Sequence, residues 1–174
     1  MKRLLLAALL LTASPALADD TAAMHAAADG FYGVYKGFHP SDGVPDAAGL
    51  AKYRPFLSDK LVTLLDQAGR AEAAFAAKNK DAPPLVEGDI FTSLFEGATT
   101  VTVGTCSGNR ASGQCTVTLS NAPPREKPVS WTDTVYLVDT PAGWRVDDIG
   151  YGGNWDFGNK GRLSQTLGEV LHFQ

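Results

Sequence analysis

The hydrophobic positions of this chain change their period near residue 100. Before it, apolar residues recur at helical spacing: Phe31, Val34, Tyr35 and Phe38 stand at i, i+3, i+4 and i+7, which is one apolar face of a helix. After it, apolar and polar residues alternate in runs rich in threonine and valine, which is typical of half-buried strands. A helical half followed by a strand-rich half predicts an α+β domain rather than alternating βαβ units.

The same pattern gives the expected elements. We expect helices over residues 21–38, 46–53, 58–78 and 161–173, and strands over residues 100–105, 116–120, 131–138 and 144–149. Ser58 is a suitable N-cap for the helix that follows it. The second half of that helix is rich in alanine, so we expect it to pack closely against the sheet.

The first 18 residues have the pattern of a cleavable signal peptide. Lys2 and Arg3 precede an apolar run, and Ala16-Leu17-Ala18 supplies small residues at the two positions that a signal peptidase recognises. The run is shorter than the roughly 20 apolar residues of a membrane span, so we expect cleavage after Ala18. The mature chain, residues 19–174, is then a single domain that lies in the periplasm or is secreted.

The charge balance bears on the partners. The chain has 15 basic and 19 acidic residues, a net charge of −4, and loss of Lys2 and Arg3 leaves 13 basic residues and a net charge of −6. An acidic chain without a basic cluster is a poor ligand for nucleic acid or for an anionic membrane. We therefore expect a small molecule or a periplasmic protein as the partner, and neither nucleic acid nor, after cleavage, a membrane.

The two cysteines predict a disulfide. Cys106 and Cys115 flank a turn-forming segment, Ser-Gly-Asn-Arg-Ala-Ser-Gly-Gln, and in an oxidising compartment such a pair closes the end of a hairpin. The bond would stabilise the domain by roughly 3 kcal/mol in the chain-entropy model. A metal pair or a reactive thiol is the alternative, but the turn holds no histidine to complete a metal site. We expect neither a metal nor a cofactor.

The order of elements and the last strand resemble a known fold. Two helices followed by an antiparallel sheet that ends in Gly-Trp-Arg-Val-Asp-Asp-Ile, residues 143–149, resemble the cone-shaped α+β fold of nuclear transport factor 2, ketosteroid isomerase, scytalone dehydratase and the polyketide cyclases. This resemblance implies helices packed on a strongly curved sheet, with a short C-terminal helix. It is also compatible with a homodimer.

A second resemblance covers nearly all of the mature chain. Residues 88–97, 144–149 and 151–158, the last reading Tyr-Gly-Gly-Asn-Trp-Asp-Phe-Gly, are similar to a family of proteobacterial exported proteins and lipoproteins of unknown function. That family implies the same fold and transfers no activity, because fold alone does not supply a function.

The segment 88–97 is the first candidate site. It carries Asp89, Thr92, Ser93 and Glu96 among large apolar residues. One interpretation is a loop that presents carboxylates to a ligand at the mouth of the cone. The alternative, which we favour, is a structural loop whose polar residues cap the next element, because Asp, Ser and Thr are common turn and cap formers.

The second candidate site surrounds Asp147 and Asp148. Alternation along a strand puts these two carboxylates on opposite faces of the sheet, so one of them is expected to face the interior. A carboxylate in an apolar cone has a raised pKa and can act as a general acid or base, but Arg162 or the indole of Trp155 would equally well hold it as a structural partner. We favour the structural role.

These segments supply the candidate residues. The candidate acid–base residues are Asp89 and Asp148. The candidate ligand-binding residues are Tyr53, Asp89, Ser93, Glu96, Asp148, Tyr151 and Trp155. We interpret the three histidines, His25, His39 and His172, as surface residues.

Three functions are compatible with these patterns. No serine-hydrolase elbow, zinc-protease helix, phosphate loop or calcium loop occurs in the chain, which favours a non-catalytic periplasmic binding module over an enzyme. An inhibitor or immunity protein against a cell-wall hydrolase is the second hypothesis, since an acidic surface complements a basic enzyme. The third is an isomerase or dehydratase that uses one carboxylate as acid or base.

Overall fold

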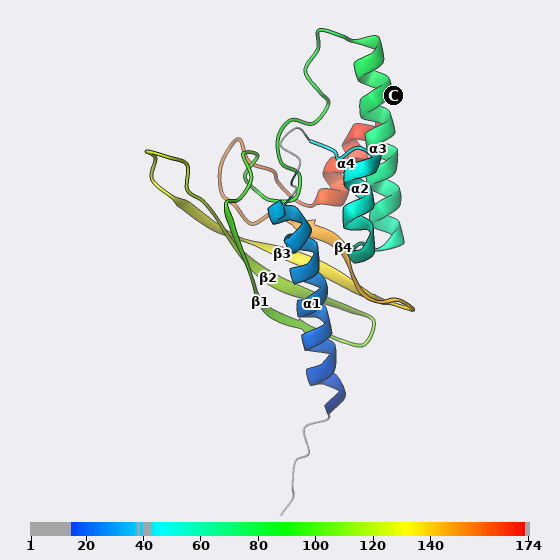
Figure 1. Ribbon diagram of the computed structural model, residues 1–174, viewed down its shortest axis with the longest axis vertical. Coiled ribbons are helices and arrows are strands. Elements are labelled where there is room, and N and C mark those ends of the chain that lie inside the picture. The colour runs from blue at the N-terminus through cyan, green and yellow to red at the C-terminus, as the bar shows by residue number, and fades with distance from the viewer. Residues whose placement is uncertain (1–14, 38, 40–42, 173–174) are drawn as a thin grey trace, which may run out of the picture.

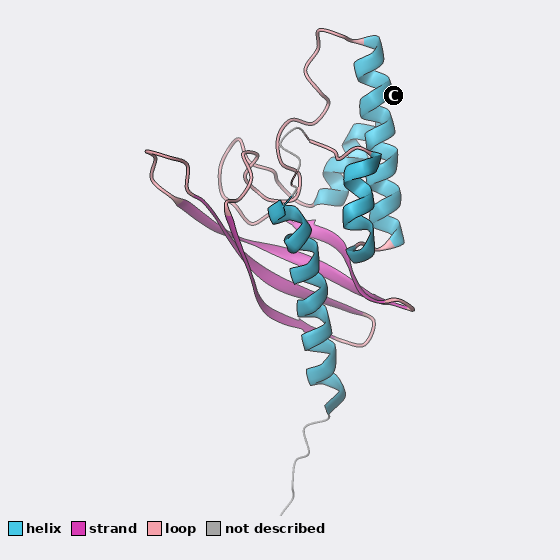
Figure 2. Ribbon diagram, viewed as in Figure 1, coloured by secondary structure: helices cyan, strands magenta, loops and turns pink. Residues whose placement is uncertain are grey.

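The computed structural model of the protein describes residues 15–37, 39 and 43–172. It confirms the α+β class, with helices, one antiparallel sheet and a short C-terminal helix (Figures 1 and 2). Residues 1–14 of the predicted signal peptide, Phe38 and the end of the last predicted helix at Phe173 lie outside the described residues. The elements are α1 (Pro15–Gly37), α2 (Ala47–Tyr53), η1 (Arg54–Phe56), α3 (Asp59–Lys78), β1 (Thr100–Gly108), β2 (Ser112–Asn121), β3 (Val129–Thr140), β4 (Gly143–Gly150) and α4 (Leu163–His172).

The four strands form a simple meander in the order β1-β2-β3-β4, with every neighbouring pair antiparallel. One face of the sheet is buried and the other carries mostly threonines and other polar residues, as the period of two predicted. All four strands are longer than expected, because their ends contain glycine, serine and asparagine that pair in the ladder although they have little strand propensity.

The helices form two groups on the sheet. Figure 1 shows α1 running along the buried face, and its contacts with the sheet are with β1, β2 and β4. The second group, α2, α3 and α4, packs together beside β4. The glycine at position 30 of α1 has a steric reason: a Cβ there would lie 2.2 Å from the ring of Phe56, so η1 reaches α1 only because the side chain is missing.

Helix α3 begins where the sequence predicts. The Ser58 hydroxyl accepts a hydrogen bond from the Leu61 amide (3.1 Å) and donates one to Asp147 on β4 (2.7 Å). The same hydroxyl therefore caps the helix and fastens it to the sheet. The expectation that the alanine-rich second half packs against the sheet is wrong: beyond Ala71 this half is mostly exposed, because the helix extends past the edge of the sheet.

A bulge in β4 decides the position of the two adjacent aspartates. Tyr136 pairs with Asp148 and Leu137 pairs with Val146, so Asp147 is an extra residue in the ladder. Asp148 is buried and Asp147 reaches solvent, which confirms that one of the two carboxylates faces the interior.

Candidate functional site

Three loops meet at one end of the sheet. In an antiparallel meander, β1 begins where β2 ends, β3 begins and β4 ends, so residues 88–99, 122–128 and 151–162 emerge at the same end. We call this the loop end; both candidate segments of the sequence lie there. The opposite end carries the β1–β2 and β3–β4 turns.

The loop end is organised around the carboxylate of Asp133, on the buried face of β3. It accepts four hydrogen bonds: from the Ser93 amide (2.9 Å), the Ser93 hydroxyl, the Gly152 amide (2.9 Å) and the indole N–H of Trp131 (3.0 Å). The donors come from the 88–97 loop, from the segment after β4 and from β3 itself. One buried side chain thus holds three segments that are distant in sequence.

The 88–97 loop and the segment after β4 are also tied directly to each other. The Asn159 side chain donates to the carbonyls of Asp89 and Thr92, both at 2.7 Å, and the hydroxyl of Tyr151 donates to the carbonyl of Ile90 (2.6 Å). The Ser93 hydroxyl accepts from the Gly153 amide (2.9 Å). The two segments therefore behave as one unit, in which polar backbone groups are satisfied without regular secondary structure.

Asp89 is the second buried carboxylate of the loop end, and it lacks such a set of donors. Its side chain is 1 % exposed; Oδ1 accepts from the Phe91 amide (2.6 Å), whereas Oδ2 has no hydrogen-bond partner among the described residues. His39 Nδ1 lies 3.5 Å from Oδ2. Burial raises the pKa of the Asp89 carboxyl to about 7, although the Tyr35 hydroxyl and two backbone amides act in the opposite direction.

His39 lies at the C-terminal end of α1, with its ring against that of Tyr35 (centroids 4.8 Å apart), and it is 34 % exposed. The interpretation as a plain surface residue is therefore incomplete. Gly97 closes the other side of the carboxylate: its φ is +81°, and a Cβ there would lie 2.8 Å from Asp89 Oδ2. Burial also raises the pKa of the Tyr35 hydroxyl well above its usual range.

The space beside Asp89 is filled by aromatic side chains. Phe31 touches Tyr32, Tyr53 and Phe91 with ring centroids 4.9–5.4 Å apart, and all four rings are fully buried. A carboxylate in this packing is not in contact with open space that a substrate could occupy. Tyr53, a candidate ligand-binding residue, is thus a core residue.

Asp148 has structural partners. It accepts from the amide and hydroxyl of Ser164 (3.0 and 2.7 Å) in the first turn of α4, and from the Ile149 amide (2.9 Å), while Arg162 lies 3.7 Å away. The carboxylate therefore holds the start of α4 on β4. Arg162 is its charged partner, and the guanidinium also covers the ring of Tyr136 at 3.9 Å.

The surface of the loop end contains a groove of about 280 Å³ that is lined in part by apolar side chains. Leu94, Val129, Trp155 and Phe157 line it. Within the described part of the chain, the large hydrophobic side chains that are exposed are Phe95 (40 %), Val129 (37 %) and Phe157 (63 %), and Phe95 packs edge-on against Phe157. Exposed apolar side chains gathered at a groove are typical of a binding site.

Four polar side chains also line the groove, and we call them its rim. They are Asn121, Glu96, Glu126 and Lys127. The Asn121 side chain donates to the Gly97 carbonyl (2.8 Å), which joins the end of β2 to the 88–97 loop. The groove thus lies on top of the hydrogen-bonded unit that Asp133 organises.

The candidate residues divide between this groove and the structure beneath it. Glu96 and Trp155 line the groove. Ser93 and Tyr151 do not line the groove but hold its loops together. Asp89 is buried in the 88–97 loop, and Tyr53 is in the core. Asp148 joins β4 to α4.

Sequence reasoning missed Asp133, Val129, Glu126 and Phe157. A signal for Asp133 was present: Trp131, Asp133, Val135 and Leu137 share the buried face of one strand, and an aspartate among apolar residues on such a face needs donors.

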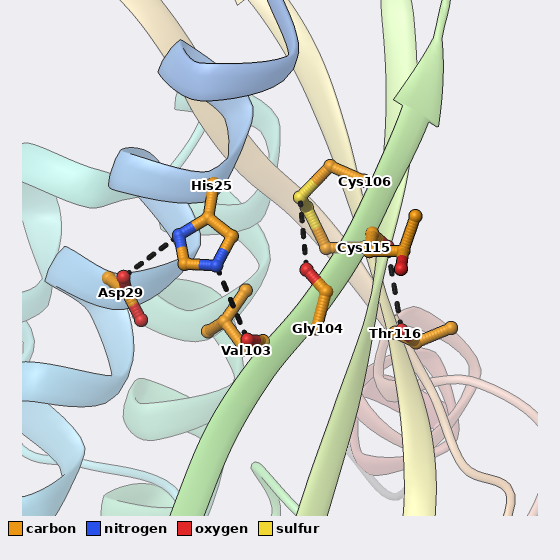
Figure 3. Close-up of a disulfide and its surroundings, with 8 residues drawn as sticks. His25, Asp29, Val103, Gly104, Cys106, Cys115 and Thr116 are labelled. Atoms are coloured by element: carbon orange, nitrogen blue, oxygen red, sulfur yellow. Dashed lines mark hydrogen bonds and ion pairs between the residues drawn. A yellow bond between two sulfur atoms is a disulfide. The ribbon is translucent and has the colours of Figure 1, made fainter.

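The opposite end of the sheet carries the disulfide. Cys106 pairs with Cys115 across β1 and β2, with their Cα atoms 4.0 Å apart, which confirms the predicted pairing (Figure 3). Beside it, His25 of α1 approaches the carbonyl oxygen of Val103 (3.3 Å) and the carboxylate of Asp29 (2.9 Å). The contact with Val103 joins α1 to β1.

No group of three or more metal-ligating side chains occurs within residues 15–37, 39 and 43–172. Among the helices described there, none has the length and hydrophobicity needed to cross a bilayer. Comparisons with family models, curated proteins and solved structures found no match to this chain. The function is therefore argued from the site itself.

Proposed function

We propose that this protein is an exported, non-catalytic binding module that holds its partner in the groove at the loop end of the sheet. The observation that carries the proposal is the position of the exposed large hydrophobic side chains. Val129 and Phe157 line this groove, Phe95 packs against Phe157, and the described surface leaves no other such side chain exposed. Keeping these side chains in water costs solubility, so a partner that covers them gives a physical reason for their position.

The underlying unit supports this proposal. A binding site works best when its walls are held in place before the partner arrives. The loop that carries Trp155 and Phe157 is fastened to the 88–97 loop by Asn159 and to the sheet by Asp133. The groove is thus preorganised, although it is built from loops.

Export and the cone fold belong to the same proposal. The charged, apolar and small-residue order of positions 1–18 favours delivery to the periplasm with cleavage after Ala18. A disulfide between Cys106 and Cys115 suits that oxidising compartment. Helices on one face of an antiparallel sheet are compatible with the cone-shaped fold that the sequence resembles.

An acid–base enzyme is the second candidate, and one observation favours it. The unpartnered Oδ2 of Asp89 faces His39, and burial raises the pKa of this carboxyl to about 7, the range in which a general base operates. Burial argues against it, because Asp89 is almost fully covered and Phe91 and Tyr35 beside it are also buried, so the carboxylate presents no exposed surface to a substrate.

The proposal is tested by native mass spectrometry of the chain purified gently from the periplasm of a Gram-negative host. We expect a mass that corresponds to cleavage after Ala18, two hydrogens below the reduced chain, with an additional small molecule or protein bound. Phe157→Ala should lose the bound species, and Gln114→Ala, an exposed change at the opposite end, should keep it. A bound species that survives Phe157→Ala and a Val129→Ser change would refute the groove as its site.

A further inference from the structure

The rim of the groove carries a net negative charge, from two glutamates and one lysine. The carboxylates of Glu96 and Glu126 form neither a hydrogen bond nor an ion pair with any residue in the described part of the chain, and Lys127 is the one basic side chain that lines the groove there. Two other surface carboxylates, Asp147 and Asp66, are neutralised by basic partners, Lys60 and Arg70. The groove thus favours a ligand that brings a positive charge.

The walls of the groove present aromatic rings. Trp155 packs edge-on against Trp131, with centroids 5.3 Å apart and the rings at 83°, and Phe157 packs edge-on against Phe95 at 5.9 Å and 89°. In an edge-on pair one ring turns its edge to the face of the other, so each pair fixes the orientation of its rings. Aromatic faces attract cations through their quadrupole, and tryptophan does so most strongly.

A ligand with both properties is an arginine side chain. Its guanidinium is planar, so it stacks on an aromatic ring, and its N–H groups match a carboxylate in a bidentate arrangement. Its aliphatic part covers apolar walls. We propose that the groove receives an arginine side chain from a basic segment of a partner protein. This inference rests on the proposed function and names the partner's chemistry.

A protein segment is a better occupant than a free organic cation. The groove has room for about one large side chain, but Phe95 and Phe157 expose apolar surface that a single cation would leave uncovered. Apolar residues next to the arginine in a peptide chain would cover it. The net charge of the protein, −4 for the whole sequence, also favours approach of a basic partner.

The test compares two peptides that differ in one side chain. Acetyl-Gly-Leu-Arg-Leu-Gly-amide is compared with the same peptide in which citrulline, a neutral analogue of the same shape, replaces arginine. Binding to the ¹⁵N-labelled oxidised protein is followed by amide chemical shifts. We expect the arginine peptide to shift residues 94–97, 121–129 and 155–157, and the citrulline peptide to bind about tenfold more weakly.

Variants of the protein test whether the rim carboxylates cause the preference for the arginine peptide. The double variant Glu96→Gln/Glu126→Gln should weaken the arginine peptide about fivefold and leave the citrulline peptide unchanged. The control Asp81→Asn/Glu169→Gln removes the same charge from exposed positions away from the groove, and should change either affinity less than twofold. Binding of the arginine peptide should also weaken as salt is raised.

The outcomes separate this inference from the proposed function. Equal affinity for both peptides, with shifts at the groove, would overturn the arginine assignment and leave the groove as a binding site. Equal weakening by the rim and control variants would overturn it too, since the effect would then be one of overall charge. Shifts confined to other surfaces, or no binding at millimolar peptide, would also refute it. The groove itself fails only if the native complex survives the Phe157 and Val129 changes.

Discussion

Asp133 and Asp89 are two buried carboxylates of the same loop end, and they differ in their donors. Asp133 accepts four hydrogen bonds from the backbone and side chains of three segments. Asp89 accepts one within the described hydrogen bonds, from Phe91, and its Oδ2 faces an imidazole nitrogen at 3.5 Å. Burial disfavours the ionised form of a carboxylate, and hydrogen-bond donors offset that cost.

Burial alone does not assign a role to an ionisable residue. Asp133 is a structural centre because its charge is fully used by donors that it holds in place. Asp89 keeps an unused oxygen, so its ionisation is costly and its pKa is raised to about 7. Four changes test the different roles of these two carboxylates.

Asp133→Asn should have the largest effect. The amide NH₂ would face N–H donors, so at least two charge-assisted hydrogen bonds are lost in a buried site, and we expect the free energy of unfolding to fall by about 5 kcal/mol. The urea midpoint measures it. Asp139→Asn, an exposed change in the same strand, should have no effect; similar losses for both would mean that Asp133 does not hold the loop end.

Asp89→Asn should instead remove a pH-dependent penalty. The folded-state pKa of about 7 lies above the ordinary value of 3.8, so the folded protein binds more protons between these pH values. The contribution of Asp89 to stability is therefore fully present below about pH 4 and is lost as pH rises through 7. Each pKa unit corresponds to about 1.4 kcal/mol, so the loss amounts to about 4 kcal/mol.

The measurement is the unfolding free energy of wild type minus that of Asp89→Asn, from pH 4 to 8. Taking the difference removes the contributions of the other carboxylates to stability, because both proteins contain them. The difference should fall as pH rises, so that the variant is the more stable protein at pH 8. The titratable groups near Asp89 are Tyr32, Tyr35, His39, Tyr53, Asp133 and Tyr151. His39→Gln should keep the slope, because burial is its main cause. A flat difference would contradict the assignment.

Replacing the disulfide should lower the stability of the protein without changing the pH dependence attributed to Asp89. Cys106→Ala/Cys115→Ala opens a short loop at the other end of the sheet, and we expect a loss of about 3 kcal/mol in the chain-entropy model. Thermal unfolding of the variant, and of the wild type with reductant, should agree. The pH dependence attributed to Asp89 should remain; if it disappears, the two ends of the sheet are coupled.

Ser93→Ala should have the smallest effect, about 2 kcal/mol. The change removes the hydroxyl that donates to Asp133 and accepts from Gly153, but leaves the amide donors in place. Ser107→Ala, at an exposed position of β1, is the matched control. A loss as large as that of Asp133→Asn would indicate that the hydroxyl, rather than the full donor set, holds the carboxylate.

The fold was largely predictable because its signals are local. The period of two predicted the strands, Ser58 marked the start of α3, and the turn between the cysteines indicated a hairpin that their pairing confirms. The failure at the alanine-rich half of α3 has a plain cause: alanine tolerates both burial and exposure, so composition does not decide which one occurs. Helix α1 begins at Pro15 rather than near position 21.

The pattern of residues was enough to place residue types on the faces of each element, and it pointed to Asp89, Ser93, Glu96 and Trp155. The role of each of these residues follows from contacts that are made in the folded protein. Hydrogen-bond donors reach Asp133 from residues 40 positions before it and 19 after it, and the groove joins three loops that no local pattern connects. Periodicity is a property of neighbouring residues, whereas the charge state of a carboxylate and the walls of a groove depend on segments that only folding brings together.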